Sequence, residues 1–206
     1  MIALVTGASS GIGKDMAKIL SNMGYDLILV ARRKERLEEL KSKLNTNVEI
    51  ICADLSKKEE CISLYELVKD KDINILINNA GFGVYGPFHK TDLNTELQLI
   101  KTNICAVHIL TKLFLKDFRN KNKGYILNVS SMAGIMPGGP LMATYYASKA
   151  YVLNLTRGIY QELKHENSNV YIGALCPGPV NTEFNKVSHA HFNVKSLSSM
   201  EVARCG

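Results

Sequence analysis

Short apolar runs alternate with longer amphipathic segments along most of this chain. The apolar runs, which predict strands, cover residues 2–5, 27–30, 48–51, 73–77, 125–129 and 170–175. Between them, apolar side chains recur at helical spacing and predict helices over residues 11–23, 33–44, 57–68, 92–118 and 144–166. Continuous apolar strands separated by helices are typical of a parallel sheet that is buried on both faces. The pattern therefore predicts an α/β protein, a doubly wound parallel sheet with helices on both faces.

No linker, repeat or shift in composition divides the chain, so we expect residues 1–206 to form a single domain. A length of 206 residues with 46% hydrophobic and 21% charged residues suits a globular domain and excludes disorder of the whole chain. No apolar run approaches the ~20 residues that a membrane helix needs, so we expect no membrane partner. The tail from residue 181 to 206 has no clear strand, although residues 199–204 have the pattern of a helix start.

The charge pattern argues against a nucleic-acid partner. The formal charge of +6 is mild, and basic residues are interleaved with acidic ones, as in residues 32–39. A nucleic-acid surface would need a dense basic stripe with aromatic side chains between the charges, which this sequence lacks.

The cysteines and histidines predict neither a disulfide framework nor a metal site. The five cysteines are odd in number and no two have CxxC spacing, so we expect reduced thiols and a cytoplasmic protein. His189 and His191 have no Cys, Asp or Glu nearby at ligand spacing. We expect an exposed loop there and no bound metal.

A glycine-rich segment lies between the first predicted strand and the first predicted helix. Its spacing is GxxxGxG, and glycines at such a turn let backbone N–H groups approach a pyrophosphate closely. The N-terminus of the following helix adds a partial positive charge. A generic strand-to-helix turn is the alternative, but three glycines and three hydroxyl groups in one turn favour a nucleotide site. We therefore expect cofactor contacts at Gly7, Ser9, Ser10, Gly11, Ile12 and Gly13.

The end of the second predicted strand indicates which dinucleotide binds. A dinucleotide-binding fold usually has an acidic residue there, about 20 residues beyond the glycines, to bind the ribose 2′-hydroxyl. Ala31 takes this place and is followed by Arg32 and Arg33. Guanidinium groups suit a 2′-phosphate, so the sequence favours NADP(H) over NAD(H). The alternative is that both arginines only face water at the end of a strand.

A tyrosine and a lysine four residues apart predict the proton donor. Tyr145 and Lys149 would share one face of a helix that begins near the carboxyl end of the fifth predicted strand, where such sheets bind ligands. A nearby positive charge lowers the pKa of a phenol, so we expect Lys149 and a cationic nicotinamide to bring that of Tyr145 down from about 10. Residues 65 and 69, and residues 160 and 164, have the same spacing but lie elsewhere in the predicted fold.

Together these segments resemble the short-chain dehydrogenase/reductase family. The matching segments follow the family's order and are residues 6–13, 54–55, 78–81, 103, 128–131, 145 with 149, and 177–182. The resemblance implies a Rossmann-like fold and hydride transfer between a nicotinamide and a ketone or secondary alcohol. It also implies a homo-oligomer, either a dimer or a tetramer.

The resemblance implies a role for each matching residue. Tyr145 would be the general acid in carbonyl reduction and the base in alcohol oxidation, Ser131 would polarise the substrate oxygen, and Lys149 would lower the tyrosine pKa and bind the nicotinamide ribose. Asn103 would support a proton-relay water, with an ordinary helix-interior amide as the alternative. Cofactor contacts are implied at Asp54, Leu55, Asn79, Ala80, Gly81, Asn103, Tyr145, Lys149, Pro177, Gly178, Val180 and Thr182.

The sequence departs from the family pattern in two places. The gap between Ser131 and Tyr145 is one residue longer than the family's usual gap, and residues 137–140 form a loop that can absorb it, so Ser130 stays an alternative for the catalytic serine. The chain stops at Gly206, where family members usually continue into a further strand and helix. We therefore expect the sheet to lack these last two elements.

The motifs do not specify the substrate. Six apolar side chains either wall an apolar substrate pocket or pack in the core: Phe82, Met132, Met136, Leu141, Met142 and Phe184. Residues 181–199 would set the specificity. We predict an NADP(H)-dependent oxidoreductase that acts on the CH–OH group or carbonyl of a small apolar molecule. The alternative is a cofactor-binding sensor or remnant without turnover.

Overall fold

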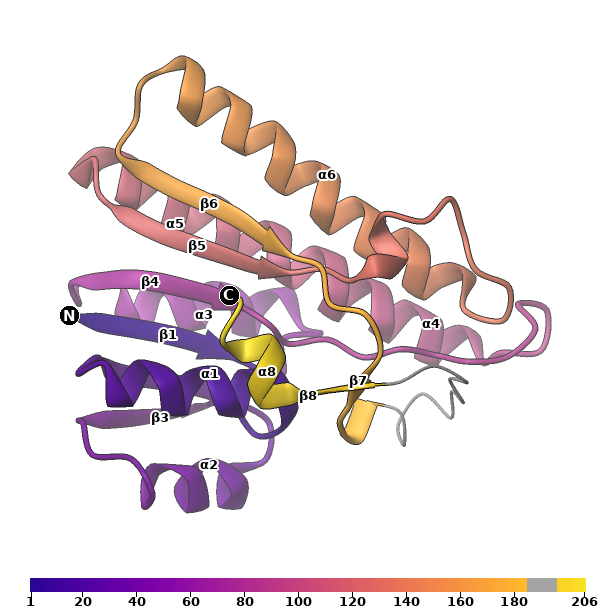
Figure 1. Ribbon diagram of the computed structural model, residues 1–206, viewed down its shortest axis with the longest axis horizontal. Helices are drawn as coiled ribbons and strands as arrows, with labels where there is room; N and C mark the ends of the chain where they lie inside the picture. Colours follow the sequence, from indigo (N-terminus) through magenta and orange to yellow (C-terminus); the bar gives the residue numbers. More distant parts are fainter. Residues whose placement is uncertain (185–195) are drawn as a thin grey trace.

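Residues 1–184 and 196–206 are described by a computed structural model of the chain. Six strands form its central sheet: β1 (Ile2–Thr6), β2 (Asp26–Ala31), β3 (Val48–Cys52), β4 (Ile73–Asn78), β5 (Gly124–Val129) and β6 (Val170–Leu175). Their order is β3-β2-β1-β4-β5-β6, and every neighbouring pair is parallel (Figure 1). Each predicted apolar run is a strand, and the predicted ends are correct to within one residue. The doubly wound parallel sheet is thus confirmed.

Helices cover both faces of the sheet. One face carries α1 (Gly11–Asn22), α2 (Lys34–Lys41) and the short α8 (Ser199–Ala203), which packs against α1 (Figure 1). The other carries α3 (Lys58–Val68), α5 (Val107–Lys121) and α6 (Ala143–His165), with α4 (Leu93–Ile100) leading into α5.

A separate apolar core lies on each side of the sheet. Met16 and Leu37 are buried between the sheet and the helices α1 and α2. On the other side Leu64 and Phe114 are buried, and the ring of Phe114 meets that of Tyr65 edge to face at 5.5 Å between centroids. Because both faces of the sheet are covered, its strands carry continuous apolar runs instead of alternating ones.

The long helix predicted over residues 92–118 is interrupted. A π-helical turn, η1 (Lys101–Ala106), separates α4 from α5, and α5 continues to Lys121. It ends where Asn122 takes a left-handed φ of 47°. A π-helical turn holds an extra residue relative to an α-helix. The spacing of apolar side chains in the sequence does not reveal this extra residue.

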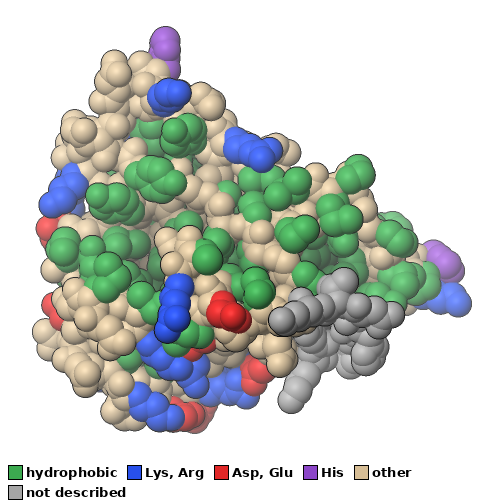
Figure 2. Space-filling model, in the orientation of Figure 1, with side chains coloured by type: hydrophobic (Ala, Val, Ile, Leu, Met, Phe, Trp, Pro, Cys, Tyr) green, Lys and Arg blue, Asp and Glu red, His purple; other side chains and the backbone are tan. Residues whose placement is uncertain are grey.

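The helix α2 is shorter than the predicted helix over residues 33–44. The helix ends at Lys41. The hydroxyl of the next residue, Ser42, donates to the carbonyl of Glu39 at 2.9 Å. Basic and acidic side chains lie interleaved at the end of the molecule that α2 forms (Figure 2). This arrangement follows from the mixed charges that the sequence has there.

The chain after β6 differs from the prediction. Two short strands, β7 (Val180–Asn181) and β8 (Leu197–Ser198), pair in parallel, so the expectation of no strand in the tail was wrong. Strands of two residues are too short to show a periodic pattern. The helix start expected over residues 199–204 is confirmed by α8, where Ser198 and Glu201 cap each other's backbone N–H groups.

The strand order determines where a ligand would bind. From β1 the chain moves outward to β2 and β3, then crosses to β4, β5 and β6 on the other side of β1. The loops after β1 and β4 therefore leave the sheet in opposite directions, which opens a crevice at the carboxyl ends of these strands. A short 3-10 turn, η2 (Met132–Gly134), follows β5 at the same edge.

Candidate active site

The glycine-rich loop joins β1 to α1, and its shape depends on glycine. Gly7 and Gly11 have φ angles of 65° and 55°, a region that L side chains rarely adopt. A Cβ atom on Gly13 would lie 2.3 Å from Nδ2 of Asn79, so a larger residue would not fit there. Because α1 begins at Gly11, its first N–H groups lack partners within the helix and can bind an anion.

Thr6 and Asn79 hold this loop against the end of β4. The Thr6 hydroxyl donates to the carbonyl of Ile77 at 3.2 Å. It also accepts the N–H groups of Asn79 at 2.9 Å and Ala80 at 3.1 Å. In return, Nδ2 of Asn79 donates to the carbonyls of Thr6 at 2.9 Å and Gly7 at 3.2 Å. Two segments that are distant in the sequence thus form one wall.

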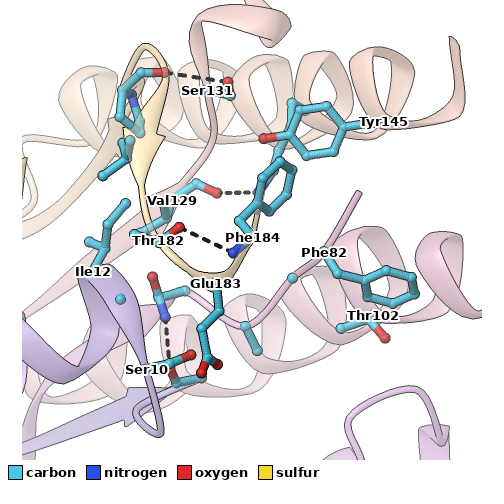
Figure 3. A pocket seen from close by; sticks show the side chains of 18 of the residues that line it. Ser10, Ile12, Phe82, Thr102, Val129, Ser131, Tyr145, Thr182, Glu183 and Phe184 are labelled. Atoms are coloured by element: carbon cyan, nitrogen blue, oxygen red, sulfur yellow. Dashed lines mark hydrogen bonds between the residues drawn. The ribbon is translucent and has the colours of Figure 1, made fainter. Parts of the chain in front are cut away.

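Arg33 lies beside the glycine-rich loop. Its guanidinium donates to the hydroxyls of Ser9 at 3.1 Å and Ser10 at 3.2 Å. Its other terminal nitrogen donates to a carboxylate oxygen of Glu183 at 3.0 Å, and Arg36 donates to the second oxygen at 2.6 Å. Hydrogen bonds from Arg36 and then Arg33 lower the pKa of Glu183. Figure 3 shows the Glu183 side chain pointing toward Ser10.

Arg32 acts on a different part of the site. Burial would raise the pKa of Asp54, but hydrogen bonds from Ser56 and the positive charge of Arg32 lower it overall. Asp54 Oδ1 accepts the N–H of Ser56 at 3.1 Å and its hydroxyl at 2.8 Å. The two arginines that the sequence singled out therefore have separate surroundings, and only Arg33 contacts the serines of the loop.

Tyr145, Ser131 and Lys149 come together beyond the carboxyl end of β5. The ammonium of Lys149 donates to the carbonyl of Val129 at 2.8 Å and lies 5.8 Å from the centroid of the Tyr145 ring. The Ser131 hydroxyl donates to the backbone carbonyl of Pro177 at 3.3 Å, and Ser131 acts to lower the pKa of Tyr145. The ring of Phe184 lies beside that of Tyr145, with 5.1 Å between centroids (Figure 3). The helix α6 supplies the tyrosine and the lysine, four residues apart on one face.

The expected lowering of the tyrosine pKa does not appear in this geometry. Burial raises the pKa of Tyr145 to about 12, and the nearby Ser131 offsets only part of that effect. Burial also lowers the pKa of Lys149 to about 8, although the nearby Cys176 acts in the opposite direction. The lowering by Lys149 together with a cationic nicotinamide stays a prediction, because in the protein alone burial is the largest influence on this pKa.

The surroundings of the two candidate serines differ. Ser130 is buried, and its hydroxyl donates to the backbone carbonyl of Lys149 at 2.8 Å. Ser131 accepts the N–H of Ala133 at 3.1 Å and is partly exposed. Both serines line the cavity, but only Ser131 acts on the pKa of Tyr145, and its role toward a substrate oxygen stays a prediction.

Asn103 is fully buried in η1. Its amide exchanges two hydrogen bonds with the backbone of Phe82, at 2.9 and 3.1 Å, and donates to the Ser148 hydroxyl at 3.1 Å. Ser148 in turn donates to the carbonyl of Tyr145 at 2.7 Å. Asn103 therefore connects the segment after β4 to α6, and its role toward a water stays a prediction.

A cavity of about 560 Å³ extends from the glycine-rich loop to Tyr145. The predicted site residues that line it are Gly7, Ser9, Ser10, Gly11, Ile12, Arg32, Arg33, Asp54, Leu55, Asn79, Ala80, Gly81, Ser131, Tyr145, Lys149, Pro177, Gly178, Val180 and Thr182. Gly13 and Asn103 are predicted site residues that do not line it. Of the proposed apolar wall, Leu141 does not line it either, while the lining includes Phe82, Met132, Met136, Met142 and Phe184.

Sequence reasoning missed two charged side chains of this site. Arg36 follows Arg33 by one helical turn, so the spacing could have predicted that the two side chains lie close together. Glu183 lies 150 residues from Arg33 along the chain, and no pattern in the sequence joins them. Gln98 and Thr102, which also line the cavity, were missed because they come from the helical segment around the π-helical turn.

The sequence predicted neither a bound metal nor a membrane helix. Within residues 1–184 and 196–206, no three His, Cys, Asp or Glu side chains are grouped to hold a metal ion. His189 and His191 lie outside the described residues. Among the helices that the structure describes, none is both long and apolar enough to cross a membrane.

The chain matches the family described as short chain dehydrogenase over residues 1–192. It is 33% identical over 203 residues to the very-long-chain 3-oxoacyl-CoA reductase of Anas platyrhynchos, covering 93% of this chain and 63% of that protein. A short-chain dehydrogenase from Sphingobium yanoikuyae, solved in complex with NADPH, has a TM-score of 0.90 and 32% identity, with 98% and 81% of the two chains covered. A Burkholderia phymatum relative in complex with NAD has a TM-score of 0.89, 98% and 83% coverage, and 23% identity, which shows the fold alone.

The chain thus belongs to the short-chain dehydrogenases, oxidoreductases that bind a nicotinamide cofactor. The family resemblance inferred from the motifs is confirmed. The chain spans less than two thirds of the length of the Anas reductase that it matches.

The depressed pKa of Lys149 predicts how stability changes with pH. Because the pKa is about 8 in the folded state and 10.5 in the unfolded reference, the unfolded chain binds more protons between these values. Stability should therefore rise with pH in this window. Relative to Lys149→Met, the wild type should gain about 2 kcal/mol of unfolding free energy between pH 8 and pH 10, measured by urea unfolding.

The matched control is Lys164→Met, which removes an exposed lysine from the same helix. This variant should follow the wild-type pH dependence. A constant difference between the wild type and Lys149→Met across the window would contradict the burial of a titrating ammonium.

Proposed function

We propose that the chain is an NADP(H)-dependent oxidoreductase that transfers a hydride between the nicotinamide and a ketone or secondary alcohol. The observation that carries this proposal is one cavity with an anion-binding loop and Arg33 at one end and Tyr145 with Lys149 at the other. Two relatives support it, one named as a 3-oxoacyl-CoA reductase and one solved with NADPH.

The residues at the first end fit the phosphates of a dinucleotide. A Cβ atom on Gly7 would lie 2.7 Å from Asn79 Nδ2, so this glycine gives close access to the backbone at a point where no side chain fits. Gly7, Ser9 and Gly11 would hold the pyrophosphate, and Arg33 would hold the 2′-phosphate. At the second end, Lys149 would bind the ribose hydroxyls. When bound, the nicotinamide would supply or accept the hydride.

Tyr145 would give a proton to the substrate oxygen during reduction and take it back during oxidation. A phenol has an ordinary pKa of about 10 and is therefore protonated at neutral pH, as a proton donor must be. Ser131 would donate to the same substrate oxygen and hold it near the phenol. The buried ammonium of Lys149 would favour the phenolate after the proton has left, because an opposite charge stabilises the ionised form.

The side chains around Tyr145 favour an apolar substrate. Phe82, Met132, Met142 and Phe184 line the cavity, and the Phe184 ring lies beside that of Tyr145. Methionine side chains adapt their shape to irregular apolar ligands. A ketone or alcohol on an apolar framework is therefore the substrate class that we propose.

Other parts of the proposal rest on the sequence. Five free cysteines favour a cytoplasmic protein, and the family resemblance implies a homo-oligomer. We also treat residues 1–206 as a single dinucleotide-binding domain. The alternative, a cofactor-binding protein without turnover, shares the loop and Arg33 but does not need Tyr145.

The first test concerns the cofactor. We expect NADPH to bind at least tenfold more tightly than NADH, a difference of ~1.4 kcal/mol, because Arg33 lies beside the glycine-rich loop, where it would bind the 2′-phosphate, and no acid takes the place of Ala31. Arg33→Ala should remove most of this preference. Titration of both cofactors, followed by fluorescence, measures it.

The control for Arg33→Ala is Lys34→Ala, which removes the neighbouring positive charge. Lys34 is paired with Glu38 at 3.7 Å within α2 and does not line the cavity. This variant should keep the preference. Equal affinities of the wild type for NADPH and NADH would refute the assignment of Arg33.

The second test concerns the proton donor. Tyr145→Phe should lower the turnover of NADPH with a panel of ketones, measured as absorbance at 340 nm, by about 10²–10⁴-fold. Cofactor affinity should change little, because the aromatic ring keeps its packing. Turnover that survives in Tyr145→Phe would exclude the phenol as the proton donor.

The control is Tyr160→Phe on the same helix, where residues 160 and 164 repeat the spacing of Tyr145 and Lys149. Tyr160 is exposed and lies outside the cavity lining, so its loss should leave turnover unchanged. NADPH binding by the wild type without turnover of any ketone would favour the non-catalytic alternative.

A further inference from the structure

The carboxylate of Glu183 lies on the arginine pair of the cofactor site. It accepts hydrogen bonds from Arg33 at 3.0 Å and from Arg36 at 2.6 Å, one on each oxygen. The same guanidinium of Arg33 donates to Ser9 and Ser10 of the glycine-rich loop. An anion is thus bound by two arginines immediately beside the loop that would hold the cofactor phosphates.

The neighbours of Glu183 hold it in this position. A Cβ atom on Gly11 would lie 3.1 Å from Cγ2 of Thr182, so Thr182 packs close to the loop. The Thr182 hydroxyl accepts the N–H of Phe184 at 3.3 Å, and the Phe184 ring packs on Tyr145. Figure 3 shows Glu183 between these two contacts, with its carboxylate on the side of Ser10. The contacts of Thr182 and Phe184 therefore position the Glu183 side chain beside the arginines.

A carboxylate and a 2′-phosphate need the same donors at this place. Guanidinium groups bind either anion through paired N–H donors, and phosphate is the more highly charged of the two. Both anions on one arginine pair would repel each other at short range. NAD(H), which has a hydroxyl where NADP(H) has the 2′-phosphate, raises no such conflict.

We infer that Glu183 competes with the 2′-phosphate of NADP(H) for Arg33 and Arg36 and thereby sets how strongly the site prefers NADP(H). This inference rests on the proposed function, which assigns the 2′-phosphate to Arg33. It adds two residues, Arg36 and Glu183, that determine cofactor specificity. Because all three side chains are partly exposed, the competition reduces the preference for NADP(H) and does not abolish it.

The test is the direct binding of cofactors and cofactor fragments to Glu183→Gln, measured by calorimetry. NADPH should bind about fivefold more tightly than to the wild type, a gain of ~1 kcal/mol, because no ion pair has to be broken. Adenosine 2′,5′-bisphosphate, which carries the same phosphate without a nicotinamide, should gain by a similar factor. NADH and adenosine 5′-monophosphate should change by less than about twofold, a difference of ~0.4 kcal/mol.

The matched control is Glu38→Gln, which removes an equal charge from α2 itself. Glu38 pairs with Lys34 and does not line the cavity, so NADPH should bind this variant as it binds the wild type. Unchanged or weaker NADPH binding to Glu183→Gln would overturn the inference while leaving the proposed function intact. An equal gain for NADH would also overturn it, because the effect would then not depend on the 2′-phosphate. A wild type that binds neither cofactor would overturn the proposed function and this inference with it.

Discussion

The parallel arrangement of β1, β4, β5 and β6 is the constraint on which the site depends. Strands that run in one direction bring all their carboxyl ends to one edge, so the loops that follow them meet there. Thr6 at the end of β1 and Asn79 just beyond β4 fix two of these loops to each other through five hydrogen bonds of 2.9 to 3.2 Å. A shift of either strand by one residue would break this connection and move the glycine-rich loop away from α6.

At the other end of the cavity, the fold accepts polar groups that cost free energy to bury. The ammonium of Lys149 is compensated by the Val129 carbonyl, yet its pKa falls to about 8. The same loss of water raises the pKa of the Tyr145 phenol. Burial therefore shifts the pKa values of both groups that the proposed chemistry uses. Sites of this kind are where natural proteins give up stability for function.

The sequence predicted the sheet and most of the cavity lining because both depend on local patterns. Continuous apolar runs located the six strands, and the glycine-rich loop and Tyr145 with Lys149 could be recognised by their spacing. The π-helical turn and the two-residue strands β7 and β8 have no period to detect. The contact between Glu183 and Arg33 joins residues 150 positions apart, and the pKa of Tyr145 depends on burial that only the packed structure reveals.

The central claim is that one cavity at this edge holds an NADP(H) with its two ends at Arg33 and Tyr145. A crystal structure of the protein grown with NADP⁺ tests it most directly. We predict density along the cavity with the pyrophosphate on the glycine-rich loop, the 2′-phosphate on Arg33, and the nicotinamide ribose beside Lys149. A cofactor bound in the reverse direction or outside this cavity would contradict the account.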